Sequence, residues 1–122
     1  MQTAYRLNID KAHICGMSMG GMIAQTFAIN NPSCTLSLIS IYSSSGRKEI
    51  GPTQELEKLK VPSLIIHGDE DPLVPVAGGK ATADAIPNAE LMIVKGMGHV
   101  LPNLNTYWNE IKAAMINHIG KV

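Results

Sequence analysis

The sequence predicts an α/β fold in which a mostly parallel, four-stranded sheet carries helices on both faces. Short apolar runs alternate along the chain with longer stretches whose apolar residues recur at helical spacing. Gly, Pro and Asn residues separate these segments, as expected for turns. With 122 residues, of which 45% are hydrophobic and 16% are charged, the chain fits one domain over residues 1–122.

Four short apolar runs are predicted to be strands. The first (12–16, AHICG) ends in a glycine, and the second (35–42, TLSLISIY) is rich in β-branched residues, which favour strands. The third (61–67, VPSLIIH) carries Pro62 near its start, where a missing N–H group is tolerated. The fourth is the run AELMIVK at 89–95.

The stretches around these runs are predicted to be helices. Residues 19–30 have apolar side chains at helical spacing and stop before an Asn-Pro pair. Residues 76–86 form a second helix, and an apolar stripe over 104–119 predicts the last one. Shorter helical turns are predicted at 1–7 and 52–59. This alternation implies a parallel sheet with right-handed crossovers, whose sites form at the carboxyl ends of the strands.

Charge and composition exclude several classes of protein. Lys plus Arg equal Asp plus Glu, and no basic cluster stands out, so nucleic acid is not expected as a partner. The sequence has no signal segment and no apolar run of membrane-spanning length, so we expect a soluble, cytoplasmic protein with no membrane partner. Cys15 and Cys34 lack the spacing of metal ligands and are expected to be buried free thiols.

The pattern G-x-S-x-G, from Gly16 to Gly20, lies between a predicted strand and a predicted helix, which is the context that this motif requires. Such a turn forces Ser18 into a strained backbone conformation, so that its hydroxyl projects clear of the chain. Gly16 and Gly20 are predicted to leave the room that the close strand and helix need, and Gly21 adds more. The N–H group of Met19 opens the helix and is predicted to stabilise a developing oxyanion. The alternative is a glycine-rich turn with an incidental serine.

A nucleophilic serine needs a base, and four histidines are available. His99 follows the fourth predicted strand in a glycine-flanked loop, which can bring its imidazole over a neighbouring strand end. We therefore predict His99 as the base, with His67, at the end of the third strand, as the alternative. His13, at the start of its strand, is expected to be structural, and His118, at the far end of the last helix, to lie at the surface.

The base in turn needs a carboxylate to orient it. The loop after the third predicted strand supplies three acids, Asp69, Glu70 and Asp71, at the carboxyl edge of the sheet. Two of these three are expected to belong only to a solvated acidic turn.

Three segments together resemble the α/β-hydrolase family, over nearly the whole chain. Residues 12–32 (AHICGMSMGGMIAQTFAINNP) are similar to its nucleophile segment, 61–75 (VPSLIIHGDEDPLVP) to its acid-bearing strand and loop, and 96–102 (GMGHVLP) to its histidine loop. The resemblance selects Asp71 as the acid, and the order Ser, acid, His agrees with the family order. Because Ser18 stands where the dehalogenases and epoxide hydrolases of the family carry Asp, the resemblance excludes those two groups.

Relative to that family, the sequence corresponds to a truncated form. The strands that normally precede the nucleophile segment are expected to be missing, together with the loop that provides a second oxyanion donor. Losing one such donor typically costs on the order of a hundredfold or more in rate. Only residues 42–60 stand where many members insert a cap, so an open site that favours small or short-chain esters is expected. The strand from Ala12 to Gly16 becomes an apolar edge, and we expect a second copy of the chain to cover it in a homo-oligomer.

The function predicted on these grounds is that of a carboxylesterase-type serine hydrolase that acts on small-molecule esters. Ser18, Asp71 and His99 would form the catalytic triad, and no metal or cofactor is required. The alternatives are a catalytically inactive α/β-hydrolase fragment, a ligand-binding module that uses the open cleft without turnover, and a thioesterase or lactonase.

Overall fold

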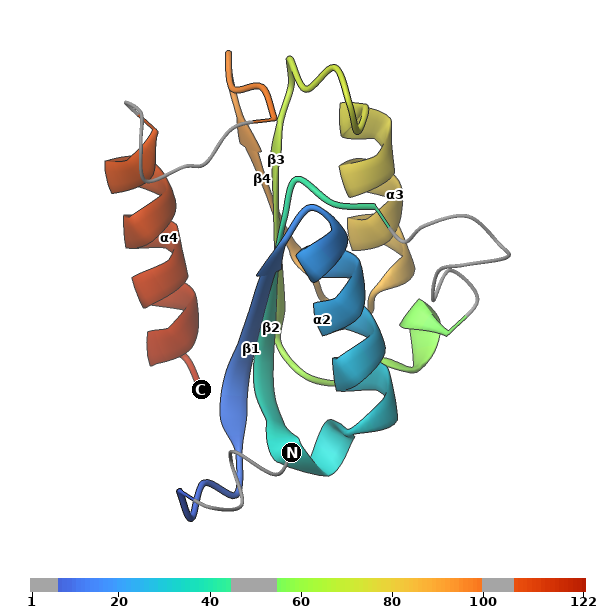
Figure 1. The fold of residues 1–122 in the computed structure, drawn as a ribbon, viewed down its shortest axis with the longest axis vertical. Helices are drawn as coiled ribbons and strands as arrows, with labels where there is room; N and C mark the ends of the chain where they lie inside the picture. Colours follow the sequence, from blue (N-terminus) through green and yellow to red (C-terminus); the bar gives the residue numbers. More distant parts are fainter. Residues whose placement is uncertain (1–6, 45–54, 100–106) are drawn as a thin grey trace.

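The computed structural model describes residues 7–44, 55–99 and 107–122, which form an α/β fold (Figure 1). In these parts of the chain, four strands and three α-helices alternate in sequence order. The strands are β1 (Ala12–Met17), β2 (Thr35–Ile41), β3 (Ser63–Gly68) and β4 (Glu90–Val94). The helices are α2 (Met19–Asn30), α3 (Val76–Ala85) and α4 (Trp108–Gly120), and single 3₁₀ turns lie at η1 (Pro32–Cys34) and η2 (Leu56–Lys58).

All four strands are parallel, and they lie in the sheet in the order β1-β2-β3-β4. The register pairs Met17 with Ile41, Ile41 with Ile66, and Gly68 with Val94, so the carboxyl ends of the strands meet at one edge. The predicted four-stranded parallel sheet is therefore confirmed. Within the described residues β1 is an edge strand, as predicted. That a second copy of the chain covers this edge stays a prediction.

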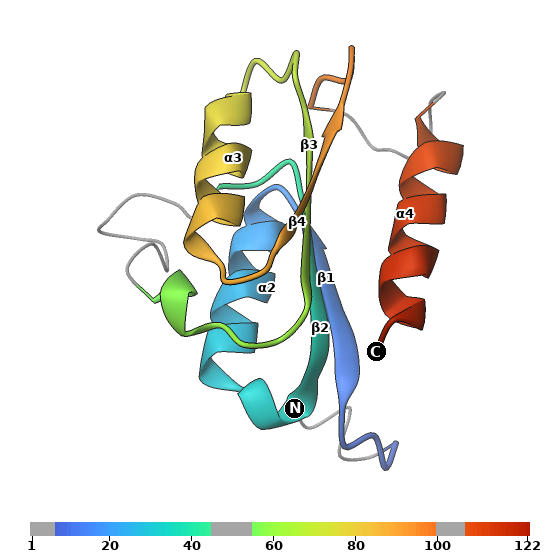
Figure 2. The same ribbon diagram turned by 180° about the vertical axis from the view of Figure 1, so that it is seen from behind.

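Helices cover both faces of the sheet, as predicted. Helices α2 and α3 lie on one face and α4 lies on the other (Figures 1 and 2). The η2 turn contacts both α2 and α3. This arrangement follows from right-handed crossovers, because successive connections between neighbouring parallel strands then pass over the same face. Helix α4 follows the last strand and covers the opposite face.

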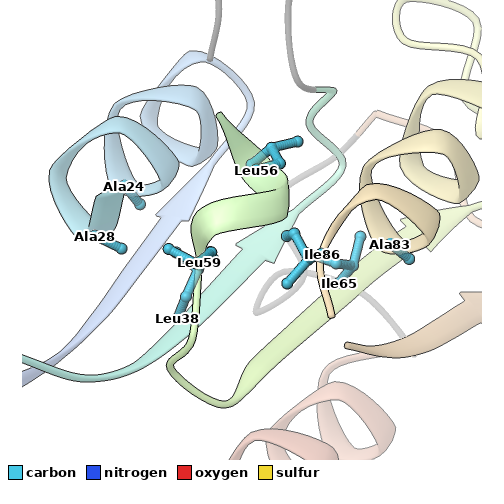
Figure 3. Packing of buried hydrophobic residues seen from close by; sticks show 8 residues of the cluster. All are labelled: Ala24, Ala28, Leu38, Leu56, Leu59, Ile65, Ala83 and Ile86. Atoms are coloured by element: carbon cyan, nitrogen blue, oxygen red, sulfur yellow. The ribbon is translucent and has the colours of Figure 1, made fainter. Parts of the chain in front are cut away.

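Each face of the sheet carries its own hydrophobic cluster. On the side of α2 and α3, the small side chains of Ala24 and Ala28 let α2 approach Leu38, and the completely buried Ile65 lies beside Ile86 (Figure 3). The remaining members of this cluster are Leu56, Leu59, Ala83 and Ile86. The cluster on the side of α4 consists of Ile39, Ile41, Tyr42, Leu64, Ile66, Val94, Met97 and Ile111. The central strands are therefore packed on both faces, which fixes the points at which the following loops begin.

Two predictions about burial are wrong. Both cysteines are free, as predicted, but Cys15 is exposed and Cys34 is partly exposed. Cys15 lies on the face of the sheet that α4 covers, and α4 packs mainly against β3. His118 was expected at the surface but is only 2% exposed. The last turn of α4 packs against the sheet, where His118 forms a hydrogen bond with the backbone of Leu38.

Some predicted segments fall partly or wholly outside the described residues. Of the helical turn predicted at 1–7, only Leu7 is described. Of the short helix predicted at 52–59, the described part contains the 3₁₀ turn η2 and no α-helix. None of the helices in the described ranges has the length and apolar character needed to cross a bilayer.

Candidate active site

The turn from β1 into α2 holds Ser18 in an unusual backbone conformation. Its φ is 54° and its ψ is −125°, a combination that L-residues rarely adopt. The Ser18 N–H group donates to the Ile41 carbonyl at 3.0 Å, which ties the turn to the end of β2. Although Ser18 is the N-cap residue of α2, its hydroxyl forms no capping hydrogen bond. The predicted strained turn is present, and it leaves the hydroxyl available to another partner.

Two glycines make this tight turn possible. A Cβ atom on Gly16 would lie 2.0 Å from the Gly20 carbonyl oxygen, and one on Gly21 would lie 2.6 Å from Cβ of Ser43. Neither position has room for a side chain. A Cβ atom on Gly20, in contrast, would meet no atom within 4 Å. The expectation that Gly20 must lack a side chain to leave room between strand and helix is wrong. The carbonyl group of Gly20 instead occupies the space next to Gly16, which is why Gly16 cannot carry a side chain.

The N–H group of Met19 stands at the N-terminus of α2, directly after Ser18. The first N–H groups of a helix lack acceptors within the helix and form the positive end of its dipole. In the described parts of the chain, the Met19 N–H group has no hydrogen-bond acceptor. The Met19 side chain is 71% exposed, so this end of the helix is accessible. This is the position expected of an oxyanion donor, and the role itself stays a prediction.

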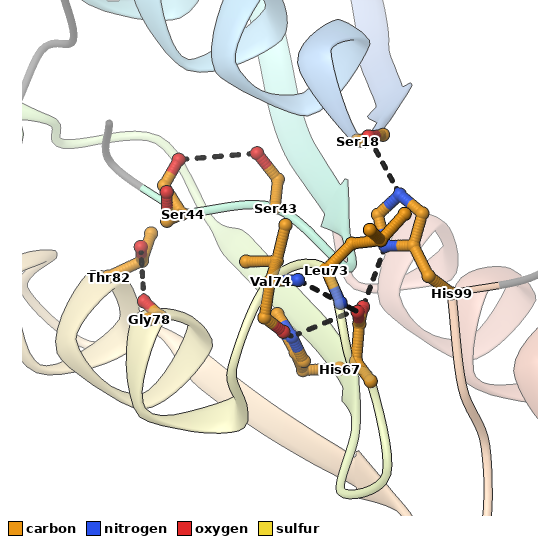
Figure 4. Close-up of polar contacts among 10 residues, drawn as sticks. Ser18, Ser43, Ser44, His67, Leu73, Val74, Gly78, Thr82 and His99 are labelled. Carbon is orange, nitrogen blue, oxygen red and sulfur yellow. Dashed lines mark hydrogen bonds and ion pairs between the residues drawn. The ribbon is translucent and has the colours of Figure 1, made fainter. Parts of the chain in front are cut away.

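A chain of hydrogen bonds joins Ser18 to His99 and His99 to Asp71 (Figure 4). Oγ of Ser18 lies 2.9 Å from Nε2 of His99, and Nδ1 of His99 lies 2.7 Å from Oδ2 of Asp71. A carboxylate only accepts, so Nδ1 carries the proton and Nε2 accepts from the serine hydroxyl. The structure therefore brings together three predicted site residues from the turn after β1 and the loops after β3 and β4.

Backbone groups hold the second carboxylate oxygen of Asp71. Its Oδ1 accepts from the N–H groups of Leu73 at 2.9 Å and Val74 at 2.8 Å. Burial raises the pKa of Asp71, but the hydrogen bonds from Val74, His99 and Leu73 outweigh this effect and hold that pKa below its usual value. Asp71 is therefore charged at neutral pH and can orient the imidazole and stabilise its protonated form.

The other two acids of this loop have different surroundings. Oδ1 of Asp69 accepts from the Gly96 N–H group at 2.7 Å, which ties the loop after β3 to the turn that leads to His99. Gly96 has a φ of 83°, in the left-handed region that favours glycine. Glu70 is exposed. Of the three candidates, Asp71 is the one whose carboxylate contacts His99.

The alternative base, His67, contacts Asp71 and not Ser18. Its imidazole is completely buried, with Nε2 2.7 Å from the Val74 carbonyl and 3.6 Å from Oδ2 of Asp71. Because a carbonyl only accepts, Nε2 carries a proton and donates to Val74. This nitrogen cannot take a proton from Ser18, so the structure does not place His67 as the base.

His13 lies near the amino end of β1, away from this edge of the sheet, and its Nδ1 is 2.7 Å from Oγ of Ser37 on β2. This contact agrees with the structural role expected of His13. Among residues 7–44, 55–99 and 107–122, no three His, Cys, Asp or Glu side chains are grouped as metal ligands would be.

Tyr42 is a site residue that the sequence analysis does not single out. Its ring centroid lies 4.4 Å from that of His99, with the two planes 60° apart. Tyr42 is buried, has a φ of 35°, and donates its hydroxyl to Sδ of Met17 at 3.5 Å. It therefore packs against both the imidazole and the strand that leads to Ser18. Its place at the carboxyl end of the second predicted strand is the signal that could have indicated it.

Solved structures are similar to nearly the whole chain. A meta-cleavage product hydrolase from Pseudomonas fluorescens IP01 matches 98% of this chain and 68% of its own length, with a TM-score of 0.86 and 16% identity. An enol-lactonase from Burkholderia xenovorans LB400 matches 97% of this chain and 69% of its own length, with a TM-score of 0.86 and 15% identity. At this level of identity, the likeness establishes the fold alone.

Curated relatives match shorter stretches at higher identity. The non-heme chloroperoxidase CPO-A1 of Kitasatospora aureofaciens is 46% identical over 48 residues, which are 38% of this chain and 18% of the relative. The bifunctional esterase/perhydrolase DCH of Acinetobacter calcoaceticus is 39% identical over 51 residues, which are 41% of this chain and 18% of the relative. The match therefore spans less than a fifth of the length of either relative.

The protein family described as TAP-like protein matches residues 23–110, which is well over half of the chain. This range includes the loops that carry Asp71 and His99. Strand β1 and the turn that carries Ser18 precede the matched range. The chain therefore belongs to the TAP-like family of the α/β-hydrolases.

Proposed function

We propose that this protein is a carboxylesterase-type serine hydrolase that cleaves small carboxylic esters through an acyl-serine intermediate. The observation that carries the proposal is the hydrogen-bonded chain of Ser18, His99 and Asp71, with contacts of 2.9 and 2.7 Å. A hydroxyl, an imidazole and a carboxylate in this order form the catalytic triad of serine hydrolases. The bifunctional esterase/perhydrolase among the relatives agrees with ester cleavage.

In the first half of the reaction, Nε2 of His99 removes the proton from Ser18 while Oγ attacks the ester carbonyl carbon. The carbonyl oxygen becomes an oxyanion, which the N–H group of Met19 stabilises at the positive end of α2. Asp71 stabilises the protonated His99. His99 then donates its proton to the leaving alcohol oxygen, the carbon–oxygen bond breaks, and an acyl-serine remains.

The second half of the reaction uses the same groups with water as the nucleophile. His99 takes a proton from water while the water oxygen attacks the acyl carbon. When the tetrahedral intermediate collapses, the bond to Oγ breaks, and His99 returns the proton to Ser18. The products are the carboxylic acid and the free enzyme.

The exposure of the triad residues agrees with access of an ester to Ser18. The side chain of His99 is 14% exposed, whereas that of Asp71 is completely buried. Ser18 is partly exposed, and the neighbouring Met19 lies largely in solvent. An ester group can therefore reach the hydroxyl while the carboxylate stays shielded from water, which strengthens its interaction with His99.

The test compares Ser18→Ala with Ser33→Ala, which removes the hydroxyl of an exposed serine in the η1 turn. With a short-chain nitrophenyl ester, Ser18→Ala should lower kcat by at least about a thousandfold, because the nucleophile is lost. Ser33→Ala should keep wild-type turnover. Circular dichroism should give the same spectrum for all three proteins.

A fluorophosphonate probe tests the nucleophile without a substrate. Ser18 should attack phosphorus with loss of fluoride, and mass spectrometry of the intact protein should find one adduct on the wild type and on Ser33→Ala, but none on Ser18→Ala. Wild-type protein that is folded but forms no adduct and cleaves no ester would contradict the proposal. Ester binding without turnover would favour a ligand-binding module.

A further inference from the structure

A second histidine, fully buried, lies near the carboxylate of Asp71: Nε2 of His67 is 3.6 Å from Oδ2, and Figure 4 shows this side chain beside Val74. His67 belongs to β3, and its Nε2 lies 2.7 Å from the Val74 carbonyl. Its Nδ1 is buried and has no hydrogen-bond partner among the described residues. The proposed reaction assigns no step to this imidazole, so its burial and its single hydrogen bond need another explanation.

The contacts of His67 hold it in one orientation and one tautomer. Donation to a carbonyl places the proton on Nε2. Its Nδ1 is buried and meets no hydrogen-bond partner among the described residues. The ring also packs directly against α3, since a Cβ atom on Gly79 would lie 2.5 Å from Nδ1. His67 is thus a fixed hydrogen-bond donor whose partner is Val74.

Val74 connects this donor to the carboxylate of Asp71. Its carbonyl accepts from His67, and its N–H group donates to Oδ1 of Asp71 at 2.8 Å. Together with the N–H group of Leu73, it occupies Oδ1 and leaves Oδ2 directed at His99. A shift of the Val74 peptide would therefore change both the direction of the carboxylate and the acceptor offered to the imidazole.

We infer that His67 is a positioning residue, which fixes the loop at 71–74 so that Asp71 presents Oδ2 to His99. The expected effect of His67 on the rate rests on the proposed function. Its effect on the orientation of Asp71 does not, because the hydrogen bonds concerned are present with or without turnover. A carboxylate on a flexible loop would sample several orientations, and small displacements of this kind lower the rate of an otherwise intact site.

Four variants test this role. His67→Leu removes the donor, and Gly79→Ala keeps it but displaces the ring. In His67→Gln the amide nitrogen stands as far along the side chain as Nε2, whereas in His67→Asn it stands at the place of Nδ1. The matched control is His118→Leu, because His118 is also buried, bonds to one backbone group and has one unpartnered nitrogen, but lies in α4.

The first readout is the proton NMR resonance of the His99 Nδ1–H group. A hydrogen bond to a buried carboxylate gives this proton a far-downfield signal, which needs no substrate and no activity. We expect the signal in the wild type, in His67→Gln and in His118→Leu. It should be broadened or lost in His67→Leu, His67→Asn and Gly79→Ala.

The second readout is steady-state kinetics with the nitrophenyl ester. The three disruptive variants should lower kcat by between about tenfold and about a hundredfold with little change in KM, because the acid–base pair is misaligned but the acyl site is untouched. His67→Gln should recover most of kcat, and His118→Leu should match the wild type.

Two results would overturn the inference. One is a folded His67→Leu variant that keeps both the downfield signal and wild-type kcat. The other is an equal loss of the signal in His118→Leu, which would reduce the effect to general destabilisation. If His67→Leu does not fold, His67→Gln and Gly79→Ala decide the same question. If the wild type cleaves no ester, the proposed function fails, and the NMR series still decides whether His67 positions Asp71.

Discussion

Strands β1 and β3 have the same length and direction and each leads to a site residue, but their surroundings differ. Every residue of β3 is buried, whereas β1 has exposed side chains at Cys15 and Met17. Two strands flank β3, and one flanks β1. The acid Asp71 therefore follows a central strand of the sheet, whereas the nucleophile Ser18 follows an edge strand.

This difference shows that the two halves of the site are held by different means. Asp71 is held by packing on both faces of β3 and by backbone hydrogen bonds in its own loop. Ser18 is held mainly by local backbone geometry, namely the tight turn and the hydrogen bond to Ile41. Substitutions should therefore act through local sterics at the edge and through loss of packing at the centre.

The largest effect is expected at the turn, from adding a single methyl group. Gly16→Ala would place a Cβ atom 2.0 Å from a backbone oxygen, so the turn cannot keep its form. We expect ester cleavage to be abolished and the free energy of unfolding to fall by on the order of 4–5 kcal/mol, the upper range for a point mutation. Gly20→Ala is the matched control, since it meets open space. Urea unfolding and turnover measure both, and equal losses in the two variants would refute the steric account.

The next largest effect is expected from shortening a buried isoleucine, and it should be larger at the centre of the sheet than at its edge. Ile65 of β3 is fully buried, and Ile14 of β1 packs against the same cluster while only partly buried. Ile65→Ala should lower the free energy of unfolding by roughly 2–5 kcal/mol. Ile14→Ala should cost about 1 kcal/mol, because less apolar surface is lost. Chemical denaturation measures both, and an equal cost would show that the β1 edge is as well covered in solution as β3.

The smallest effect is a pH dependence at the end of α4. Burial lowers the pKa of His118. The charge of Glu90 and the hydrogen bond to the backbone of Leu38 raise this pKa by less, so it stays below its usual value. The unfolded chain therefore binds this proton at a higher pH than the folded chain. Above about pH 6.5, the usual pKa of histidine, His118 is neutral in both the folded and the unfolded chain, and its full contribution to stability is present. This contribution is lost as the pH falls towards the lower pKa that His118 has in the folded protein. Urea unfolding between pH 8 and pH 5 should show a smaller decline for His118→Gln, and parallel curves would exclude this contribution.

Much of the fold could be predicted from sequence periodicity. The strands at β2 and β4 and the helix at α2 follow from β-branched runs and helical spacing, which are local properties of the chain. The alternation of these elements leads to the parallel sheet, because short connections between parallel strands must cross over one face. The G-x-S-x-G pattern likewise indicates a strained turn, since its shape depends on five consecutive residues.

The acid of the site needed more than local pattern. Asp69, Glu70 and Asp71 are equivalent by position in the loop, and only the family resemblance selected Asp71. In the structure, the Gly96 N–H group engages Asp69, and two backbone N–H groups turn Asp71 towards His99. The selection therefore depends on a contact between the loops after β3 and β4, which no local pattern encodes.

The sequence by itself determined the order of strands and helices and the strained serine turn, and it favoured His99 over His67 as the base. Only the tertiary structure decided that Cys15 is exposed, that His118 and His67 are buried, and that Gly21 rather than Gly20 lacks room for a side chain. The physical reason is the range of the interactions. Periodicity and turn geometry are set by neighbours along the chain, whereas burial and hydrogen-bond partners depend on which distant segments meet across the sheet.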